Sequence, residues 1–421
     1  MRAARPVTRP GRPVTRPGSL WRNRDFTLLW GGQALSGLGG SMAALAFPLI
    51  ILSIRGSAVL AGVVGTVALA TSALVGIPAG VLVDRVDRRM LMLSCDAIRL
   101  IAFAVLVSLL LTGHGSFVAV LVVAVVEALC DTPYSNASMA SVRALVPADD
   151  VRTAVARNEA RQYGVALAGP PLGGLLFGIT RSLPFLVNAV SYVASAVALL
   201  LIRTPLQEER TPSSQSPLRD LGVGLRHVAT TPALRATVMV AAPLNFALNG
   251  VIFGIVVVLR DRGVAAGLIG TVETIIGICG LLGAILAPVL MARVSALTLL
   301  RVICLLGVPL LLLVRPLAAT PLAALPVGLL VLMGPALNSI LFGHLAKTVP
   351  DALQGRVLSA LMVATMSMTA LAPIVIGTLV HHFGATGMVV GVASAMAVSV
   401  VVVLLSVGIR EFGTLEEPSA V

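Results

Sequence analysis

Charged residues are scarce in this 421-residue chain: Asp, Glu, Lys and Arg together make up 11%, against 57% hydrophobic residues. A soluble domain contains about 25% charged residues. The mean hydropathy is +1.00. So little charge cannot cover a water-exposed surface of this size, which excludes a cytosolic globular enzyme. The sequence predicts an all-α integral membrane protein.

Lysine, cysteine and aromatic residues are also rare. Lys347 is the single lysine, and it does not stand in a GxxxxGK[ST] phosphate-binding loop, so ATP-driven pumping by this chain is excluded. The net charge of +12 is not organised as a basic stripe with interleaved aromatics, which argues against nucleic acid as a partner. The four cysteines are far apart inside apolar runs. We therefore expect no disulfide, no metal site, no cofactor and no enzymatic activity.

Twelve runs in the sequence are apolar and long enough to cross a membrane as helices, which takes about 20 residues each. The polar, Pro- and Ser-rich stretch 203–233 divides them six and six. The predicted spans are 26–53, 58–82, 90–112, 116–140, 155–179, 183–202, 234–259, 264–291, 296–314, 321–345, 355–379 and 385–409.

The arginine distribution predicts the orientation. With the N-terminus inside, 24 of the 30 basic residues fall on inner segments and five on outer ones, while Arg99 lies within a span. Both termini are therefore expected in the cytoplasm. The predicted parts are a disordered Arg/Pro-rich tail (1–20), a first six-helix bundle (21–203), a cytoplasmic linker (204–233), a second bundle (234–410) and a cytoplasmic tail (411–421).

The two halves share short sequence patterns at nearly constant offsets. Ala61-Gly62-x-x-Gly65-Thr66-Val67 recurs as Ala266-Gly267-x-x-Gly270-Thr271-Val272, Val146-Pro147 recurs as Val349-Pro350, and Pro170 and Gly174 recur as Pro373 and Gly377. A parallel repeat of six spans predicts a pseudo-twofold axis along the membrane normal. Two bundles would then pack around a central cavity, as in alternating-access transporters.

The connection between the second and third spans carries a recognisable loop. Residues 80–89 read GVLVDRVDRR and resemble the major facilitator superfamily signature G-x-L-a-D-r-x-G-r-k, with Asp87 in place of the second glycine. The resemblance implies that Asp84 latches the cytoplasmic side in the outward-open state, with Arg143 or the region of Gly355 as partner. The alternative is that the loop is only a positively charged boundary between two helices, which would explain its arginines but not Gly80 or Asp84. The matching positions are Gly80, Leu82, Asp84, Arg85, Arg88 and Arg89.

Two further stretches carry the same resemblance. Residues 169–174 of the fifth span read GPPLGG and look like the core of the antiporter motif, through Gly169, Pro170, Gly173 and Gly174; Val165 replaces the usual upstream glycine. Residues 21–33 resemble the start of the branch that holds macrolide efflux pumps and the enterobactin exporter. The resemblance implies export, whereas ordinary helix packing is the alternative reading of the glycines and prolines.

Five ionisable side chains well inside predicted spans carry the functional hypothesis, because burial in lipid is costly and usually marks a pathway. Asp96 and Arg99 share one helix face, which predicts a self-neutralising pair with a structural or gating role. Glu127 and Asp131 also share a face near the midplane, and no basic residue follows in their span before Arg143. Repulsion and desolvation then favour proton uptake by one of them. We expect Glu127, Asp131 and Glu273 to carry proton coupling, with structural carboxyls or contacts to a cationic substrate as alternatives.

The fold expected from these observations is a twelve-helix major facilitator protein of the bacterial cytoplasmic membrane, working as a monomer without cofactors. The expected function is proton-coupled export of a hydrophobic or amphiphilic small molecule. A substrate uptake symporter, a non-transporting receptor and a lipid-flipping protein are alternatives. Polar side chains expected to line the cavity, each equally able to bond a neighbouring helix, are Gln33, Tyr134, Asn136, Tyr163, Asn188, Asn245, Asn249 and Asn338.

Overall fold

The computed structural model describes residues 19–207 and 217–406, and all regular structure in that part of the chain is helical. The predicted tails 1–20 and 411–421 lie outside it, except for the start of the short helix η1 (Ser19–Arg22). The helices of the first half are α1 (Arg24–Arg55), α2 (Ala58–Arg85), α3 (Arg88–Leu111), α4 (Phe117–Leu145), η2 (Ala148–Asp150), α5 (Val151–Ile179) and α6 (Leu183–Leu201). Those of the second half are α7 (Pro217–Thr230), α8 (Pro232–Asp261), α9 (Ala266–Arg293), α10 (Ala296–Leu317), η3 (Pro321–Ala323), α11 (Ala324–Thr348) and α12 (Asp351–Leu405).

Short polar residues start several of the long helices. The side chains of Asn23, Ser57 and Ser116 each accept a hydrogen bond from the backbone N–H three residues on, which satisfies one free donor of the first turn. Asp87 does the same for α3, accepting from the Met90 N–H at 2.9 Å. The residue that departs from the family loop signature is therefore the N-cap of α3.

Ten helices of the described chain are long and apolar enough to cross a membrane. Helix α5 is not among them, because its first half carries Arg152, Arg157, Glu159 and Arg161. The spans predicted at 355–379 and 385–409 form one helical run, α12, which breaks at Gly384, where φ is 60° and ψ is −149°. Only glycine adopts that backbone conformation readily.

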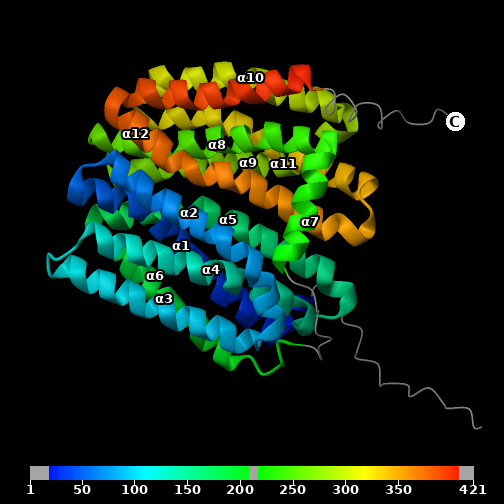
Figure 1. Ribbon diagram of the computed structural model, residues 1–421. Helices are drawn as coiled ribbons and strands as arrows, with labels where there is room; N and C mark the ends of the chain where they lie inside the picture. The colour runs from blue at the N-terminus through cyan, green and yellow to red at the C-terminus, as the bar shows by residue number, and fades with distance from the viewer. Residues whose placement is uncertain (1–18, 208–216, 407–421) are drawn as a thin grey trace, which may run out of the picture.

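The helices form two groups (Figure 1). Helices α1 to α6 pack against one another, and α8 to α12 do the same. The two groups meet through α2 with α12 and through α5 with α9. These four helices carry the Gly- and Pro-containing patterns that recur between the halves, and glycines of these patterns contact the other half of the molecule.

Helix α7 lies within the segment predicted as a linker and was not predicted as a helix. It packs across the ends of α8 and α12, and it also touches α2 (Figure 1). Gly224 lies directly on the Arg356 carbonyl, where a side chain would collide. Under it lies a small apolar cluster made of Val228, Leu234, Val349, Val357, Ala360 and Leu361.

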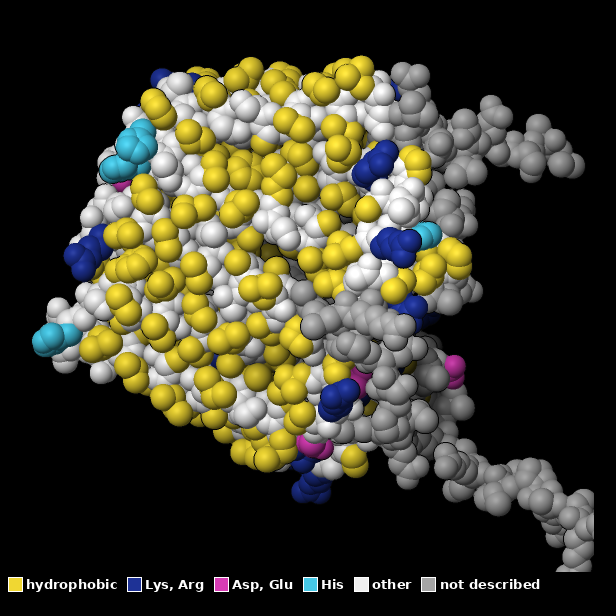
Figure 2. Space-filling model, viewed as in Figure 1, with side chains coloured by type: hydrophobic (Ala, Val, Ile, Leu, Met, Phe, Trp, Pro, Cys, Tyr) yellow, Lys and Arg dark blue, Asp and Glu magenta, His cyan; other side chains and the backbone are white. Residues whose placement is uncertain are grey.

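The polar and apolar parts of the surface are separated along the helices. Figure 2 shows hydrophobic side chains over the middle of the visible face, while basic, acidic and histidine side chains gather at its two ends. An apolar band between polar ends fits a bilayer whose hydrocarbon core is about 30 Å thick. The chain is thus a multi-pass membrane protein by helix length, composition and surface.

Candidate functional site

A cavity of about 640 Å³ lies between the two groups of helices. Its wall comes from α1, α2, α4, α5 and Arg99 of α3 on one side and from α8, α9 and α12 on the other. This volume is in the range of sites for drug-sized molecules, about 300–1,000 Å³. Most of the wall is apolar, and the polar groups are concentrated on the first-half side.

We call the end where α1 begins the inner end, because the arginine distribution predicts that it faces the cytoplasm; the opposite end is the outer end. The outer end is closed by glycines in direct contact with the opposite half. A side chain at Gly62 would collide with the Pro373 carbonyl, and one at Gly174 would collide with the Ala266 carbonyl. Two hydrogen bonds also cross, from the Ile374 N–H to Thr66 (3.0 Å) and from the Thr274 hydroxyl to the Leu167 carbonyl (3.2 Å).

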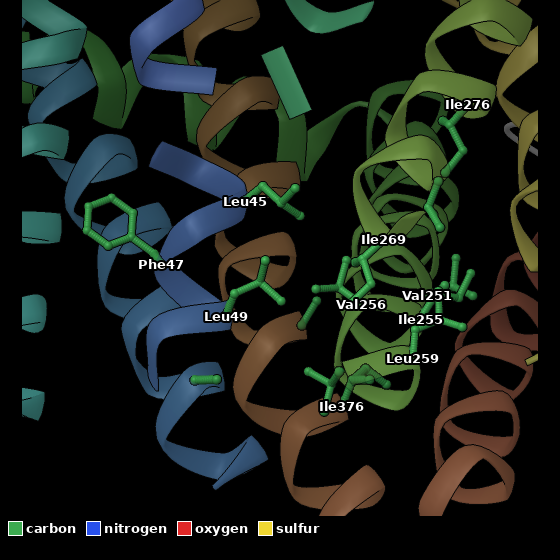
Figure 3. Close-up of a cluster of buried hydrophobic side chains, with 14 of the residues drawn as sticks. Leu45, Phe47, Leu49, Val251, Ile255, Val256, Leu259, Ile269, Ile276 and Ile376 are labelled. Carbon is green, nitrogen blue, oxygen red and sulfur yellow. The ribbon is translucent and has the colours of Figure 1, made fainter. Parts of the chain in front are cut away.

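Apolar side chains complete this outer closure. Figure 3 shows Leu45 and Leu49 of α1 pointing toward Val256 of α8 and Ile269 of α9, with Ile376 of α12 beside them. All five are nearly fully buried. A packed apolar layer of this kind excludes water from the outer end of the cavity.

At the inner end, the described glycines of α2 and α12 make no contact of this kind. Gly80 of α2 and Gly355 of α12 face open space. Gly80 therefore makes no close helix contact in this conformation. In the described part of the chain Asp84 and Arg143 form no ion pair within 4 Å. The conformation is therefore closed at the outer end and open toward the inner end, with the predicted latch residues apart.

The arginines of the loop signature hold neighbouring segments together. Arg88 donates to the carbonyls of Ala140 and Leu206, and Arg89 donates to those of Ile202 and Thr204. These four bonds tie the start of α3 to the last turns of α4 and to the segment after α6. Arg88 and Arg89 thus fix the inner end of the first half, whatever Asp84 does.

The antiporter-like segment is a contact surface on both sides of α5. Gly169 and Gly173 allow α1 to approach at Ser41 and Met42, where a side chain would collide. On the other side, the Pro170 carbonyl lies against Gly270 of α9. Close backbone approach through small residues is the usual way in which helices pack in membranes. Helix α5 therefore links the first half to the second through this segment.

Arg99 is the centre of a buried charged cluster beside the cavity. It is 2% exposed, and its guanidinium lies 2.9 Å from Asp96, 3.7 Å from Glu127 and 3.6 Å from Asp131. The same guanidinium lies over the rings of Tyr134 and Tyr192, at 4.7 and 4.5 Å from their centroids. Cation–π contacts of this length add to the ion pairs when the group is desolvated.

Hydroxyl groups complete the cluster. Tyr192 donates to Glu127 at 2.7 Å and itself accepts from the Asn188 amide at 3.0 Å. Ser195 donates to Asp96 at 2.7 Å, and the Tyr134 hydroxyl lies 2.8 Å from Ser195. Asp96 and Glu127, the two more buried carboxyl groups, thus each have one hydroxyl partner from α6 in addition to Arg99.

This geometry corrects one expectation. Glu127 and Asp131 were expected to lack a nearby cation, yet Arg99 contacts both. The expectation failed because the cation comes from the neighbouring helix α3, whereas sequence spacing reveals only partners on the same helix. Asp96, expected to neutralise Arg99 alone, shares it with two further carboxyl groups.

The three candidate coupling residues differ in their exposure to the cavity. All three line it. The Glu127 side chain is 18% exposed, whereas that of Asp131 is 64% exposed. Glu273 on α9 has neither a hydrogen bond nor an ion pair in the described part of the chain. It is the acid that the second half contributes to the cavity wall.

Of the eight predicted cavity residues, Gln33, Tyr134 and Asn249 line the cavity. Asn188 is fully buried inside the first half, where it bonds Tyr192. The other four do not line the cavity: they are Asn136, Tyr163, Asn245 and Asn338. Sequence reasoning missed Arg161, which it assigned to an inner segment and which lines the cavity from α5.

The sequence matches the family described as Major Facilitator Superfamily over residues 29–373. The multidrug efflux pump Tap of Mycolicibacterium fortuitum is 25% identical over 406 residues, covering 91% of this chain and 96% of that protein. Macrolide efflux protein A of Streptococcus pyogenes is 22% identical over 228 residues, which cover 54% of this chain and 56% of that protein.

Solved structures share the fold at low sequence identity. A bacterial homologue of the human lysosomal transporter Spinster, inward-facing and unoccupied, superimposes with a TM-score of 0.69 at 16% identity, covering 97% of this chain and all of that one. An inward-facing bacterial homologue of the iron transporter ferroportin superimposes with a TM-score of 0.65 at 17% identity, covering 94% of this chain and all of that one. A D-xylose–proton symporter superimposes with a TM-score of 0.62 at 12% identity, covering 92% of this chain and 97% of that one.

Proposed function

The chain belongs to the major facilitator superfamily, and on that premise we propose that it is a secondary active exporter that exchanges a hydrophobic or amphiphilic small molecule for protons. Two relatives that are named efflux proteins support the direction of transport. The GPPLGG segment supports it too, because it resembles the core of the antiporter motif of exporters. The fold alone does not choose a direction, because a proton symporter shares it.

The topology that goes with this proposal has twelve crossings. Helix α5 and the second leg of α12, after Gly384, are added to the ten apolar helices. Both termini then lie in the cytoplasm, as the arginine distribution predicts. We propose the bacterial cytoplasmic membrane as the location, 21–203 and 234–410 as the two bundles, and 204–233 as the linker, which here includes α7.

The observation that carries the coupling proposal is the sharing of Arg99. Three carboxyl groups, Asp96, Glu127 and Asp131, lie within 4 Å of one guanidinium. With all three ionised, the cluster holds more negative than positive charge. Either a proton or a cationic group of the substrate can neutralise the excess negative charge, so the proton and the substrate compete for the same carboxyl groups.

The proposed cycle follows from that competition. In the outward-open state Glu127 takes up a proton, which weakens the hold on a substrate cation. In the inward-open state, the conformation described above, the proton leaves toward the cytoplasm and the substrate binds. Because linkage between two ligands is reciprocal, substrate binding in turn favours loss of the proton. Inward flow of protons then drives outward movement of the substrate.

The test uses everted membrane vesicles that contain the full chain, with rhodamine 6G and erythromycin as transported probes. We expect an imposed pH gradient, acidic inside, to drive accumulation by the wild type. Glu127→Gln abolishes that accumulation while the protein stays folded. Glu159→Gln on the exposed face of α5 is the matched control and keeps wild-type accumulation. Accumulation by Glu127→Gln at the wild-type rate would remove this residue from the mechanism, and accumulation without a gradient would contradict coupling.

A further inference from the structure

A second cation, Arg161 of α5, lines the inner part of the cavity apart from the Arg99 cluster. Its Nη1 donates to the Gln33 backbone carbonyl at 2.9 Å, and its Nε donates to the Asn158 side chain at 3.2 Å. Both partners are neutral. Among the described residues no carboxylate lies within 4 Å of Arg161. The protein therefore positions this guanidinium but does not neutralise its charge.

Apart from the Nε of Arg99 in the charged cluster, two further side-chain atoms of the cavity wall have no hydrogen-bond partner in the described part of the chain. The side-chain Nε2 of Gln33 and the Oγ of Ser138 are buried and make no hydrogen bond in the described part of the chain. Gln33 is 5% exposed and Ser138 is 4% exposed. Buried polar groups are almost always hydrogen-bonded in folded proteins, so an unpaired donor on a cavity wall indicates a missing acceptor.

The position of Arg161 relative to the acids follows from α1. The Cα of Gly37 faces the Arg161 guanidinium, and that of Gly40 faces the Glu127 carboxyl. Three residues of an α-helix rise about 4.5 Å, so the two groups lie roughly one helical turn apart along the cavity. The cavity thus presents a cationic, donor-rich patch toward its inner end and an acidic cluster further out.

We propose that Arg161, Gln33 and Ser138 form a subsite for a carboxylate, or a comparable oxyanion, of the transported molecule. This inference rests on the proposed function and narrows its substrate class to zwitterionic amphiphiles. The oxyanion is held by Arg161 and the unpaired Gln33 amide at the inner end, while the cationic part lies toward Glu127, Asp131 and Glu273. Arg161 suits this role because guanidinium groups bind carboxylates through charge-assisted hydrogen bonds.

The test compares rhodamine B, a zwitterion with a free carboxylate, with its ethyl ester, a cation that is otherwise the same molecule. Binding of each dye to the full-length protein in lipid nanodiscs is measured by fluorescence anisotropy against empty nanodiscs. We expect the wild type to bind rhodamine B about tenfold more tightly than the ester, the size of one charge-assisted hydrogen bond. Arg161→Gln removes this preference, and Arg161→Lys retains part of it.

Arg152→Gln is the matched control for the change in net charge. Arg152 stands on the same helix, is exposed and does not line the cavity, so its loss leaves the preference unchanged. Because Arg161 also bonds α1, its replacement could disturb packing. Gln33→Met avoids this difficulty, since the amide Nε2 has no described protein partner to lose. We expect Gln33→Met to keep the wild-type melting temperature and to bind rhodamine B several-fold more weakly, with ester binding unchanged.

The outcomes separate this inference from the proposed function. Equal binding of the two dyes by the wild type, or an equal loss of preference in Arg152→Gln, would overturn the subsite. If the subsite were overturned but proton-driven accumulation persisted, the export proposal would stand without the oxyanion subsite. Conversely, a preference that depends on Arg161, together with transport that ignores the pH gradient, would establish the subsite and reject the coupling.

Discussion

The two walls of the cavity differ in chemistry although their helices share a sequence repeat. The first-half wall contains Arg99, Arg161 and the carboxyl groups of Glu127 and Asp131. The second-half wall consists of Asn249, Ile252, Phe253, Val256, Glu273 and Pro373. One half therefore carries a bonded network of charges, and the other presents apolar surface with a single acid.

The repeat explains why the two walls differ. Several of the repeated glycines and prolines lie where the halves touch, Gly62 against Pro373 and Gly270 against Pro170. At the repeat offsets of 203 and 205, the position of Glu127 corresponds to Leu330 and Leu332. The halves have thus kept the small residues needed for mutual packing and have diverged in the residues that bind ions. The residues that pack the halves together are thus different from those that carry charge in the cavity, and substitutions of the two kinds should have different effects.

The largest effect is expected at Arg99. Arg99→Gln leaves carboxyl groups buried without their cation, and breaking a buried ion pair from one side costs about 3–5 kcal/mol. We expect a loss of this size in the free energy of unfolding, measured by denaturant titration of the purified protein. The double variant Arg99→Gln with Asp96→Asn should recover part of it, since the most buried acid is then neutral. Unfolding of Arg99→Gln at the wild-type denaturant concentration would show that the network does not stabilise the first half.

An intermediate effect is expected at the contact between the halves. Gly174→Val places a side chain against the Ala266 carbonyl and forces α5 and α9 apart. Overpacking of this kind costs about 1–3 kcal/mol. We expect the outer closure to loosen, so that a cysteine introduced at Leu45 becomes accessible to a membrane-impermeant maleimide. Gly178→Val is the control, because it lies on the same helix facing open space. Equal labelling in the two variants would contradict the assigned closure.

The smallest effect on stability is expected at Glu273. Its carboxyl group has no described partner, so Glu273→Gln should change the free energy of unfolding by less than about 0.5 kcal/mol, as for other positions without partners. Binding of the cationic ester of rhodamine B should weaken several-fold, because Glu273 is the one acid that the described second half contributes to the wall. A destabilisation comparable to that of Arg99→Gln would show that the second half has a network of its own.

Much of the scaffold could be predicted from the sequence. Apolar runs of sufficient length located the long helices, and the recurring patterns divided them into two halves. That the recurring glycines and prolines lie at the contacts between the halves was not predicted. Helix α7 escaped prediction because its segment is short and polar and its apolar residues find their partners on α8 and α12. The break at Gly384 was read as a loop, because composition alone cannot show that the helix continues on both sides.

The site was harder to predict than the fold. Asp96 and Arg99 could be paired from their spacing, but the contacts of Arg99 with Glu127 and Asp131 depend on how α3 packs against α4. Arg161 was counted with the inner segment although it lies within the predicted span 155–179, because element boundaries are the least certain part of a sequence-based prediction. Asn136 and Tyr163 lie on helices that line the cavity but are not part of its wall, and sequence periodicity did not reveal which helix face lines it. Asn338 lies on α11, which contributes no described residue to the wall.

The central claim is that proton and substrate movement are linked through the carboxyl groups around Arg99. It is tested most directly by counting protons in proteoliposomes loaded with the pH indicator pyranine while rhodamine 6G is transported. The account predicts that each dye molecule moved in one direction is matched by a fixed number of protons moved in the other, and that Glu127→Gln moves none. Dye transport with no accompanying change in internal pH would contradict it.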